Sequence, residues 1–413
     1  MTDAASGPRA LLDHPAFIRY WTATIGSRLA MQIYSVAVGW YVYDLTQSAM
    51  ALGLVGLAQF APMAVVALPA GVVADRFNRR RILPIVLALQ CAAIVLILLL
   101  MLMDQLGLTA LYALITLHAV GRAFEMPLGS AIIPTLVPPS LLKTALAFGS
   151  TSNQAVIISG PALGGFLYLL GPSVVFALVA ALFGFASLRA QSLARVPGPA
   201  QPPPTGAGRK AIFAGLAFIR GRPEILGAIS LDLMAVLLGG AVALLPIFAR
   251  DILMVGPIGL GLMRAAPAVG AIVMGTLLTL RPIQHHMGHI MFAAVATFGL
   301  ATIGFGLSTS LPLSLACLAV LGAADQVSVV IRVTLVAVMT PDELRGRVSA
   351  VNSLFIGTSN QLGEFESGVT AAWLGVVPAT VVGGLGTLAV VALWLFMFPS
   401  LRRIDTIAAP VRK

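Results

Sequence analysis

Twelve long apolar segments, separated by short polar ones, constrain this chain more than any other feature of its sequence. A helix needs about 20 apolar residues to cross the hydrocarbon core of a bilayer. In lipid, only helices and closed barrels satisfy their backbone hydrogen bonds, and these segments lack the alternation of barrel strands. The sequence therefore predicts an all-α integral membrane protein with twelve transmembrane helices, at residues 17–43, 49–74, 82–103, 107–135, 142–169, 172–192, 225–249, 256–280, 287–309, 311–338, 345–372 and 376–399.

The composition argues against a soluble enzyme, because 59% of the residues are hydrophobic and only 10% are charged. Soluble domains have about 25% charged residues. The sequence contains no P-loop, nucleophile elbow or zinc-protease motif, so we expect no enzyme activity, no ATP hydrolysis, no cofactor and no metal site. Cys91 and Cys317 lie far apart inside apolar segments, which argues against a disulfide framework. The net charge of +10 is scattered between apolar segments, so we expect no nucleic-acid partner.

The distribution of basic residues predicts the orientation in the membrane. Of the 25 Lys and Arg residues, 20 fall on one side of the alternating loops and only Arg250 falls on the other. Loops rich in Lys and Arg stay in the cytoplasm, so both termini are expected there. The polar segment 1–16 has no apolar core or cleavage site, and we expect no signal peptide.

The chain is expected to divide into two pseudo-symmetric six-helix bundles, residues 17–192 and 224–399. The sequence Pro139-Ser-Leu-Leu-Lys143 resembles Pro341-Asp-Glu-Leu-Arg345 after 202 residues, close to half the chain. Such repeats occur in transporters. A cytoplasmic linker at 193–223 begins with a Pro/Gly-rich run. It continues as an amphipathic helix suited to the membrane surface, with Ile212, Leu216 and Ile219 on one face. Residues 400–413 form a cytoplasmic tail.

The loop after the second apolar segment reads Gly71-Val-Val-Ala-Asp75-Arg76-Phe-Asn78-Arg79-Arg80-Arg81-Ile-Leu83. It resembles the signature of the major facilitator superfamily, G-x-x-x-D-R-x-G-R-[KR]-x-x-[LI]. Asn78 replaces the usual Gly, and Asn tolerates the left-handed conformation better than most residues. Gly71 would allow close helix contact. Asp75 is expected to face the positive start of the eleventh helix, near Leu344 and Arg345, and to stabilise the closed cytoplasmic side. The alternative is an ordinary cytoplasmic loop.

Two further stretches narrow the resemblance. Gly160-Pro161-Ala-Leu-Gly164-Gly165 is similar to part of the fifth-helix motif of facilitator antiporters that export, although Val156 stands where that motif has Gly. The alternative is simple helix packing through small residues. The stretch from Arg332 to Glu366, with Arg345, resembles the branch that contains the bacterial enterobactin exporter and related drug or siderophore exporters. This resemblance implies the bacterial inner (plasma) membrane as the location.

Several ionisable or polar residues lie inside the apolar segments, where they mark functional or paired sites by default. The resemblance implies that helices 1, 4, 7 and 10 line the central cavity, and most of these residues fall there. The candidates for the cavity and for proton coupling are Arg28, Gln32, His118, Arg122, Glu125, Asp232, Asp325, Arg332, Asn360 and Glu364.

The spacing of these residues suggests how a proton could be carried. Arg122 lies one turn before Glu125, and Arg332 two turns after Asp325, so each arginine could hold a carboxylate that later becomes protonated. Asp232 has no basic residue at helical spacing. It is therefore expected to pair across helices or to protonate easily. The alternative for each residue is a static charge pair, and for His118 a simple hydrogen-bonding role.

These features lead to a prediction of secondary active transport. The expected function is proton-coupled efflux of a small organic molecule by alternating access, with the substrate, protons and the bilayer as partners of a monomer. Uptake of a solute by the same fold and translocation of a lipid or amphiphile remain alternatives. A receptor or scaffold is disfavoured, because the loops are too short to hold a soluble domain.

Overall fold

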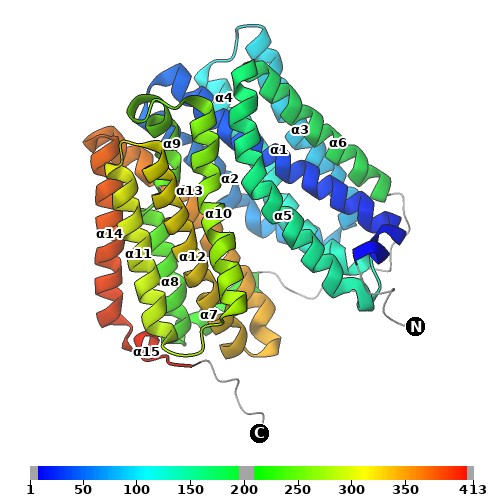
Figure 1. The fold of residues 1–413 in the computed structure, drawn as a ribbon. Helices are drawn as coiled ribbons and strands as arrows, with labels where there is room; N and C mark the ends of the chain where they lie inside the picture. Colours follow the sequence, from blue (N-terminus) through cyan, green and yellow to red (C-terminus); the bar gives the residue numbers. More distant parts are fainter. Residues whose placement is uncertain (1–7, 195–208, 407–413) are drawn as a thin grey trace. The chain divides into compact units, whose positions relative to one another are not determined.

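The computed structural model describes residues 8–194 and 209–406, and every regular element in these ranges is helical (Figure 1). The elements in chain order are η1 (Pro8–Asp13), α1 (Pro15–Thr46), α2 (Ala49–Arg76), α3 (Arg79–Leu102), α4 (Leu108–Ile132), η2 (Ile133–Thr135), α5 (Pro139–Leu167), η3 (Tyr168–Leu170), α6 (Pro172–Ala194), α7 (Arg209–Arg220), α8 (Pro223–Leu238), η4 (Ala241–Leu244), α9 (Leu245–Ile247), η5 (Phe248–Ile252), α10 (Gly256–Leu280), α11 (Met287–Leu307), α12 (Leu311–Met339), α13 (Asp342–Leu374), α14 (Val376–Met397) and α15 (Pro399–Arg402).

The predicted all-α membrane fold is confirmed. Within the described residues, nine helical segments are long and apolar enough to cross a membrane: α2, α3, α5, α6, the run Pro223–Ile252, α10, α11, α12 and α14. Three more long helices, α1, α4 and α13, stand where the sequence predicts spans but do not meet this criterion. The count of twelve spans therefore stays a prediction.

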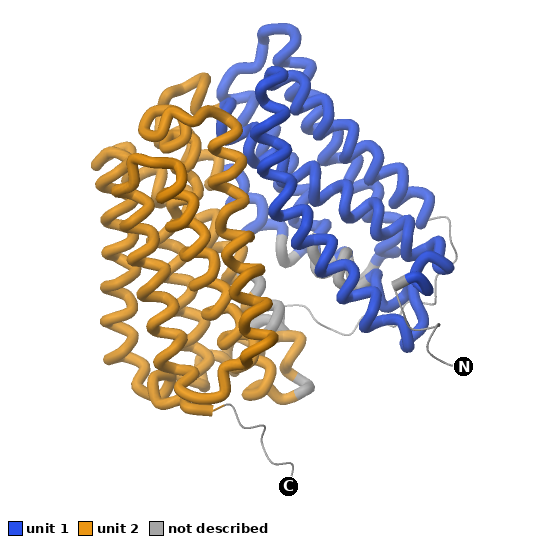
Figure 2. The backbone as a smooth tube through the Cα atoms, viewed as in Figure 1, with its two compact units in different colours: residues 1–41, 58–206 blue, residues 42–57, 207–413 orange. Residues whose placement is uncertain are grey.

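The chain forms two compact units (Figure 2). Unit 1 comprises Met1–Tyr41 and Ala58–Gly206, and unit 2 comprises Val42–Leu57 and Ala207–Lys413. In unit 1, α3 packs along both α6 and α4. In unit 2, α12 packs along α10 and α11, and α11 also packs along α14.

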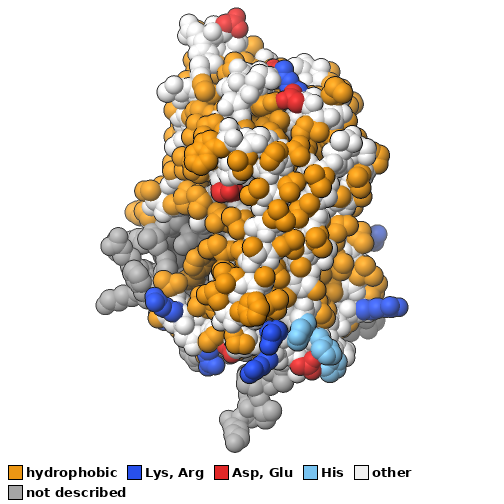
Figure 3. Space-filling model, turned by 90° about the vertical axis from the view of Figure 1, so that its left-hand side faces the viewer, with side chains coloured by type: hydrophobic (Ala, Val, Ile, Leu, Met, Phe, Trp, Pro, Cys, Tyr) orange, Lys and Arg blue, Asp and Glu red, His pale blue; other side chains and the backbone are white. Residues whose placement is uncertain are grey.

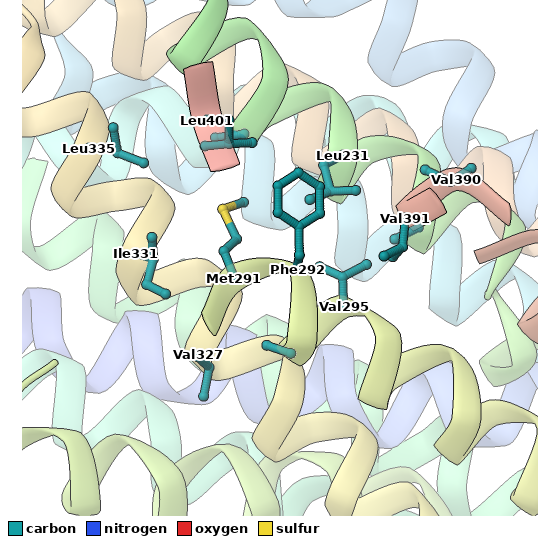
Figure 4. Packing of buried hydrophobic residues seen from close by; sticks show 13 residues of the cluster. Leu231, Met291, Phe292, Val295, Val327, Ile331, Leu335, Val390, Val391 and Leu401 are labelled. Carbon is teal, nitrogen blue, oxygen red and sulfur yellow. The ribbon is translucent and has the colours of Figure 1, made fainter. Parts of the chain in front are cut away.

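A buried apolar cluster holds the helices of unit 2 together (Figure 4). Met291 and Phe292 of α11 lie among side chains from four other helices, including Leu231 of α8 and Ile331 of α12. Burying a side chain of this size contributes roughly 1.5–3 kcal/mol in water-soluble proteins. In lipid the gain comes instead from close packing between helices.

Large apolar side chains also cover the outside of the molecule. The face drawn in Figure 3 is mostly hydrophobic, and most of its Lys and Arg side chains and its His side chains lie near the lower edge. Trp373 is 79% exposed and Phe396 is 81% exposed. Such a surface is stable in contact with lipid chains, which agrees with a multi-pass membrane protein.

The seventh predicted span, at 225–249, is not one continuous helix. α8 ends at Leu238, and the chain continues through the short turns η4 and α9 into the π-helical turn η5. At the break, a Cβ on Gly240 would lie 2.7 Å from the backbone oxygen of Gly363 on α13. Only glycine allows the two backbones to come this close. Neighbouring protein can supply hydrogen-bond partners to the backbone groups that an interrupted membrane helix leaves unpaired.

The predicted amphipathic helix exists as α7, but it packs on protein. Ile219 is 1% exposed and lies in a buried cluster with Ile225, Val348 and Val351. A Cβ on Gly215 would lie 2.9 Å from the backbone oxygen of Arg347, so α7 sits tightly on α13. The expectation that its apolar face lies in the membrane surface is therefore wrong for Ile219, because α8 and α13 cover it. The Pro/Gly-rich part of the linker lies outside the described residues.

Candidate functional site

A buried ion pair joins α8 and α12 inside unit 2. Arg332 Nη1 lies 2.9 Å from Asp232 Oδ2, and the two side chains are only 2% and 6% exposed. Ser328 donates a hydrogen bond of 3.4 Å to the other carboxylate oxygen of Asp232. Asp232 is thus paired across helices. The sequence predicted either this pairing or a carboxylate that protonates easily.

Two more polar residues complete this site, which we call the α8–α12 charge cluster: Asp232, Asp325, Ser328, Arg332 and Asn352. Arg332 Nη1 also donates to Asn352 Oδ1 at 3.3 Å. Asp325 lies close enough for the charges of both Asp232 and Arg332 to act on it. The cluster therefore contains two carboxylates and one guanidinium group in a largely apolar surrounding, where every charge needs a partner.

The local sequence explains how the cluster is assembled. Asp325, Ser328 and Arg332 follow each other at helical spacing and share one face of α12. Asp232 stands one residue after Leu231, which is fully buried and belongs to the same apolar cluster of unit 2 as Ile331. The apolar packing of α8 on α12 thus brings the carboxylate of one helix to the guanidinium group of the other.

In unit 1, Glu125 is held by neutral donors from two other helices. Ser27 Oγ donates to its Oε1 at 2.7 Å, and Gln90 Nε2 donates to its Oε2 at 3.1 Å. Gln90 is 1% exposed. Each carboxylate oxygen of Glu125 thus accepts a hydrogen bond from a neutral side chain of another helix. The sequence-based hypothesis considered only Arg122 as a partner and missed Ser27 and Gln90.

His118 lies in an aromatic environment. Its ring is 4.6 Å from the ring centroid of Tyr34 and 5.3 Å from that of Phe183, and its Nε2 has no hydrogen-bond partner among the described residues. The charge of Arg122 acts on both His118 and Tyr34. His118 is thus packed among aromatic rings, and its role in a proton relay stays a prediction.

The two candidate site residues on α13, Asn360 and Glu364, lie in different environments. Asn360 is exposed. The Cβ of Glu364 lies against α2, where a Cβ on Gly56 would be only 2.8 Å from it, and its charge acts on Arg264 of α10. Glu366 instead accepts a hydrogen bond of 2.8 Å from Thr370. Glu364 and Glu366 therefore have different partners, as their two-residue spacing on a helix predicts.

The signature loop folds differently from the expectation at Asn78. Asn78 has φ −66° and ψ 105°, and its side chain accepts a hydrogen bond from Arg80 N at 3.0 Å. Asn78 is thus an extended N-cap of α3 and not a left-handed turn residue. Arg80 is buried and donates to the backbone oxygen of Thr135 at 3.0 Å. Arg79 is half-buried, and the side chains of Gly71, Asp75 and Arg76 lie outside the description.

The glycines of the fifth-helix motif face α1. A Cβ on Gly160 would lie 2.5 Å from Gln32 Cβ, and one on Gly164 would lie 3.2 Å from Ile33 Cα. Pro161 and Gly165 are also buried in α5. This geometry agrees with close helix packing and gives Gln32 a place at the contact. Arg345, at the start of α13, is exposed and donates to the backbone oxygen of Ala337 at 3.2 Å.

A set of polar contacts that sequence reasoning missed joins the C-terminal end of α1 to η5 within unit 2. Arg250 Nη1 lies 2.6 Å from Asp44 Oδ1. Tyr43 donates a short hydrogen bond to Asp251. Arg250 was singled out only as the one basic residue on its side of the predicted membrane. The signal that could have suggested the pairing is the single charge Asp44 in one segment and the adjacent charges Arg250 and Asp251 in the other, all on the same side of the predicted membrane.

Comparison with known proteins agrees with this architecture. Residues 6–411 match the family described as transmembrane secretion effector. The chain therefore belongs to this family of the major facilitator superfamily, as the signature loop indicated. Its members are transporters, and the chain is accordingly a membrane transporter of the major facilitator type.

Curated relatives cover nearly the whole chain. The enterobactin exporter of Escherichia coli O1:K1 is 26% identical over 396 residues, which are 95% of this chain and 94% of that protein. The enterobactin exporter of Citrobacter koseri has the same identity and coverage. The resemblance to the exporter branch is thus confirmed.

Solved structures share the fold at low sequence identity. A bacterial homologue of the human lysosomal transporter Spinster, inward-facing and occupied, matches with a TM-score of 0.69 and 16% identity, over 95% of this chain and 96% of that one. A transporter of the POT family in complex with a thioalcohol-conjugated peptide matches with a TM-score of 0.73 and 12% identity, over 93% and 96%. These likenesses support the major facilitator fold.

Proposed function

We propose that the protein is a proton-coupled exporter of a small organic molecule of drug or siderophore type, in the bacterial inner membrane with both termini in the cytoplasm. The enterobactin exporters among its relatives support export of such a substrate. The basic residues on one side of the loops support the orientation. The observation that carries the proposal is the α8–α12 charge cluster.

The composition of this cluster suits it to bind and release a proton. Asp232 and Asp325 both act on a single cation, Arg332, so the cluster has an excess negative charge when both carboxylates are ionised. Two carboxylates that share one buried site do not remain ionised together without cost. Binding one proton neutralises the excess and loosens the hold of Asp232 on Arg332.

Proton binding must also change the affinity of the transporter for its substrate. A ligand shifts a conformational equilibrium only by its differential affinity for the two states. Release of Arg332 would leave a positive charge available in one state and paired in the other. Because export against proton entry requires proton and substrate to bind in alternation, we expect the substrate to bind in the state with the unprotonated cluster and to leave when the proton binds. Glu125, with its hydrogen bonds from Ser27 and Gln90, is a second candidate for proton binding.

The test uses inside-out vesicles that contain the full-length protein and an acidic lumen. Enterobactin is the probe, because the relatives are named for its export. We expect accumulation in the lumen that collapses when the pH gradient is dissipated. Asp232→Asn and Asp325→Asn should lose uphill accumulation yet keep exchange of labelled for unlabelled enterobactin. Asp405→Asn, an exposed carboxylate of the same unit, serves as the control.

Three results would argue against the proposal. Accumulation of enterobactin that does not depend on the pH gradient would show that transport is not coupled to protons. Movement of enterobactin only out of the acidic lumen would indicate uptake. Normal pH dependence in both Asn variants and in Glu125→Gln would show that these carboxylates are structural.

A further inference from the structure

A cavity of about 250 Å³ lies within unit 1 between α1 and α5, and we call it the α1–α5 pocket. Its polar and aromatic lining comes from Tyr20, Trp21, Thr24 and Arg28 on α1 and from Ser150 and Asn153 on α5. The α1 residues recur at the spacing of one helix face, and so do the α5 residues. None of them belongs to the α8–α12 charge cluster.

One end of the pocket is aromatic and held in place. The indole N–H of Trp21 donates to Ser152 Oγ at 3.1 Å, and its ring centroid lies 5.2 Å from that of Phe148. Tyr20 and Phe17 stand on the same face of α1 and are mostly buried. Because these rings are fixed by neighbours, they offer a preformed surface on which a flat ring can stack.

The other end of the pocket is polar and cationic. Arg28 is exposed and makes no salt bridge or hydrogen bond with the described residues. It lies eight residues after Tyr20, roughly 12 Å along the helix axis. Asn153 and Ser150 of α5 add amide and hydroxyl donors. A cation inside a predicted span needs an anionic partner, and a guanidinium group binds carboxylates with two parallel hydrogen bonds.

We propose that the α1–α5 pocket binds an organic anion with one aromatic ring, the ring lying at Tyr20 and Trp21 and the carboxylate at Arg28. The volume is near the lower end of the range for ligand pockets, about 300 Å³, so it suits one ring with its acid group and not a larger molecule. This inference rests on the proposed function, because it assigns the pocket to an aromatic acid part of the exported molecule.

The location agrees with an exporter. The pocket residues lie in the first half of α1 and in the first half of α5. With the termini in the cytoplasm, both halves are the cytoplasmic ones. A molecule made in the cytoplasm would therefore reach this pocket before it crosses the membrane.

The experiment measures binding without transport. The full-length protein in lipid nanodiscs is titrated with 2-aminobenzoate by calorimetry, and empty nanodiscs correct for partition into lipid. We expect saturable binding at one site. Benzamide, which lacks the charge, and cyclohexanecarboxylate, which lacks the aromatic ring, should each bind about tenfold more weakly or not at all.

Variants locate the site. Arg28→Gln should weaken binding of 2-aminobenzoate about tenfold and make it equal to binding of benzamide, while Arg28→Lys should retain part of the affinity. Lys143→Gln is the matched control, because it removes one exposed cation from α5 outside the pocket. If Arg28→Gln does not yield monodisperse protein, Asn153→Leu tests the same end of the pocket.

The outcomes separate this inference from the proposed function. Absence of binding to the wild-type protein, or equal loss in Arg28→Gln and Lys143→Gln, overturns the pocket assignment even if vesicles accumulate enterobactin. Binding that depends on Arg28 supports the pocket even if the transport assay shows no proton coupling. Equal binding of all three probes would show that the pocket does not select aromatic anions.

Discussion

Arg332 of α12 donates to Asp232 of α8 over 2.9 Å, and both side chains are almost completely shielded from solvent. The pair is thus enclosed by the packing of two helices within one unit. An enclosed pair contributes to stability only while both partners are present, because removal of one leaves a buried charge alone. This relationship makes the pair sensitive to single substitutions.

Asp232→Asn should lower the free energy of unfolding in detergent micelles by about 3 kcal/mol. Replacing both partners, as in Asp232→Leu with Arg332→Met, should restore most of the loss, because no uncompensated charge remains. Urea or SDS titration followed by circular dichroism measures both values. The matched control is Asp44→Asn in the exposed pair with Arg250, where the change should stay below about 1 kcal/mol. A double variant less stable than Asp232→Asn would contradict this account.

Gly160→Ala should destabilise unit 1, because the new Cβ would lie 2.5 Å from Gln32 Cβ on α1. Overpacking of this kind typically costs about 1–3 kcal/mol. Gly149→Ala on the same helix is the control, since no heavy atom beyond the adjacent backbone of α5 lies within 4 Å of a Cβ there, and it should be neutral or stabilising. Thermal unfolding of the two variants in the same detergent compares them. Equal melting temperatures would mean that α5 and α1 are not in close contact at Gly160.

The pKa of Asp405 is lowered, chiefly by the hydrogen bond from the backbone N–H of His286 and then by that from the His285 ring. A carboxyl group with a lowered folded-state pKa stabilises the folded form at pH values above its ordinary range, near 4, and loses this effect as the pH falls through the lowered value. We therefore expect the contact between the α10–α11 loop and the segment after α15 to persist from pH 7 to about 5. It should weaken only when the pH falls below the ordinary range of a carboxyl group.

Hydrogen exchange at the amides of residues 286–288 measures this contact, since Gly288 N donates to the backbone oxygen of Ile404 at 2.9 Å. Asp405→Asn should raise exchange at pH 7 to the level that the wild-type protein shows in acid. Asp104→Asn, a loop carboxylate in unit 1, should leave these amides unchanged. Exchange that is fastest near neutral pH after correction for the intrinsic rate would refute the role of Asp405.

The sequence by itself determined the all-α membrane class, because long apolar segments have few solutions in lipid. It also determined the family, since the spacing of Gly71, Asp75 and Arg76 is a local pattern that can be recognised without knowing how the helices pack. Helical periodicity placed Asp325 and Arg332 on one face of one helix. These conclusions depend on neighbours along the chain, and the sequence displays those directly.

Only the tertiary structure decided which residues meet across helices. Arg332 has a carboxylate two turns away on its own helix, yet it pairs with Asp232 of α8. Glu125 takes its donors from Ser27 and Gln90 on two other helices. Ile219 of α7 packs on protein rather than in the membrane surface. Spacing fixes the face of a helix, whereas the partner of that face is set by how all the helices pack their side chains, which no local pattern encodes.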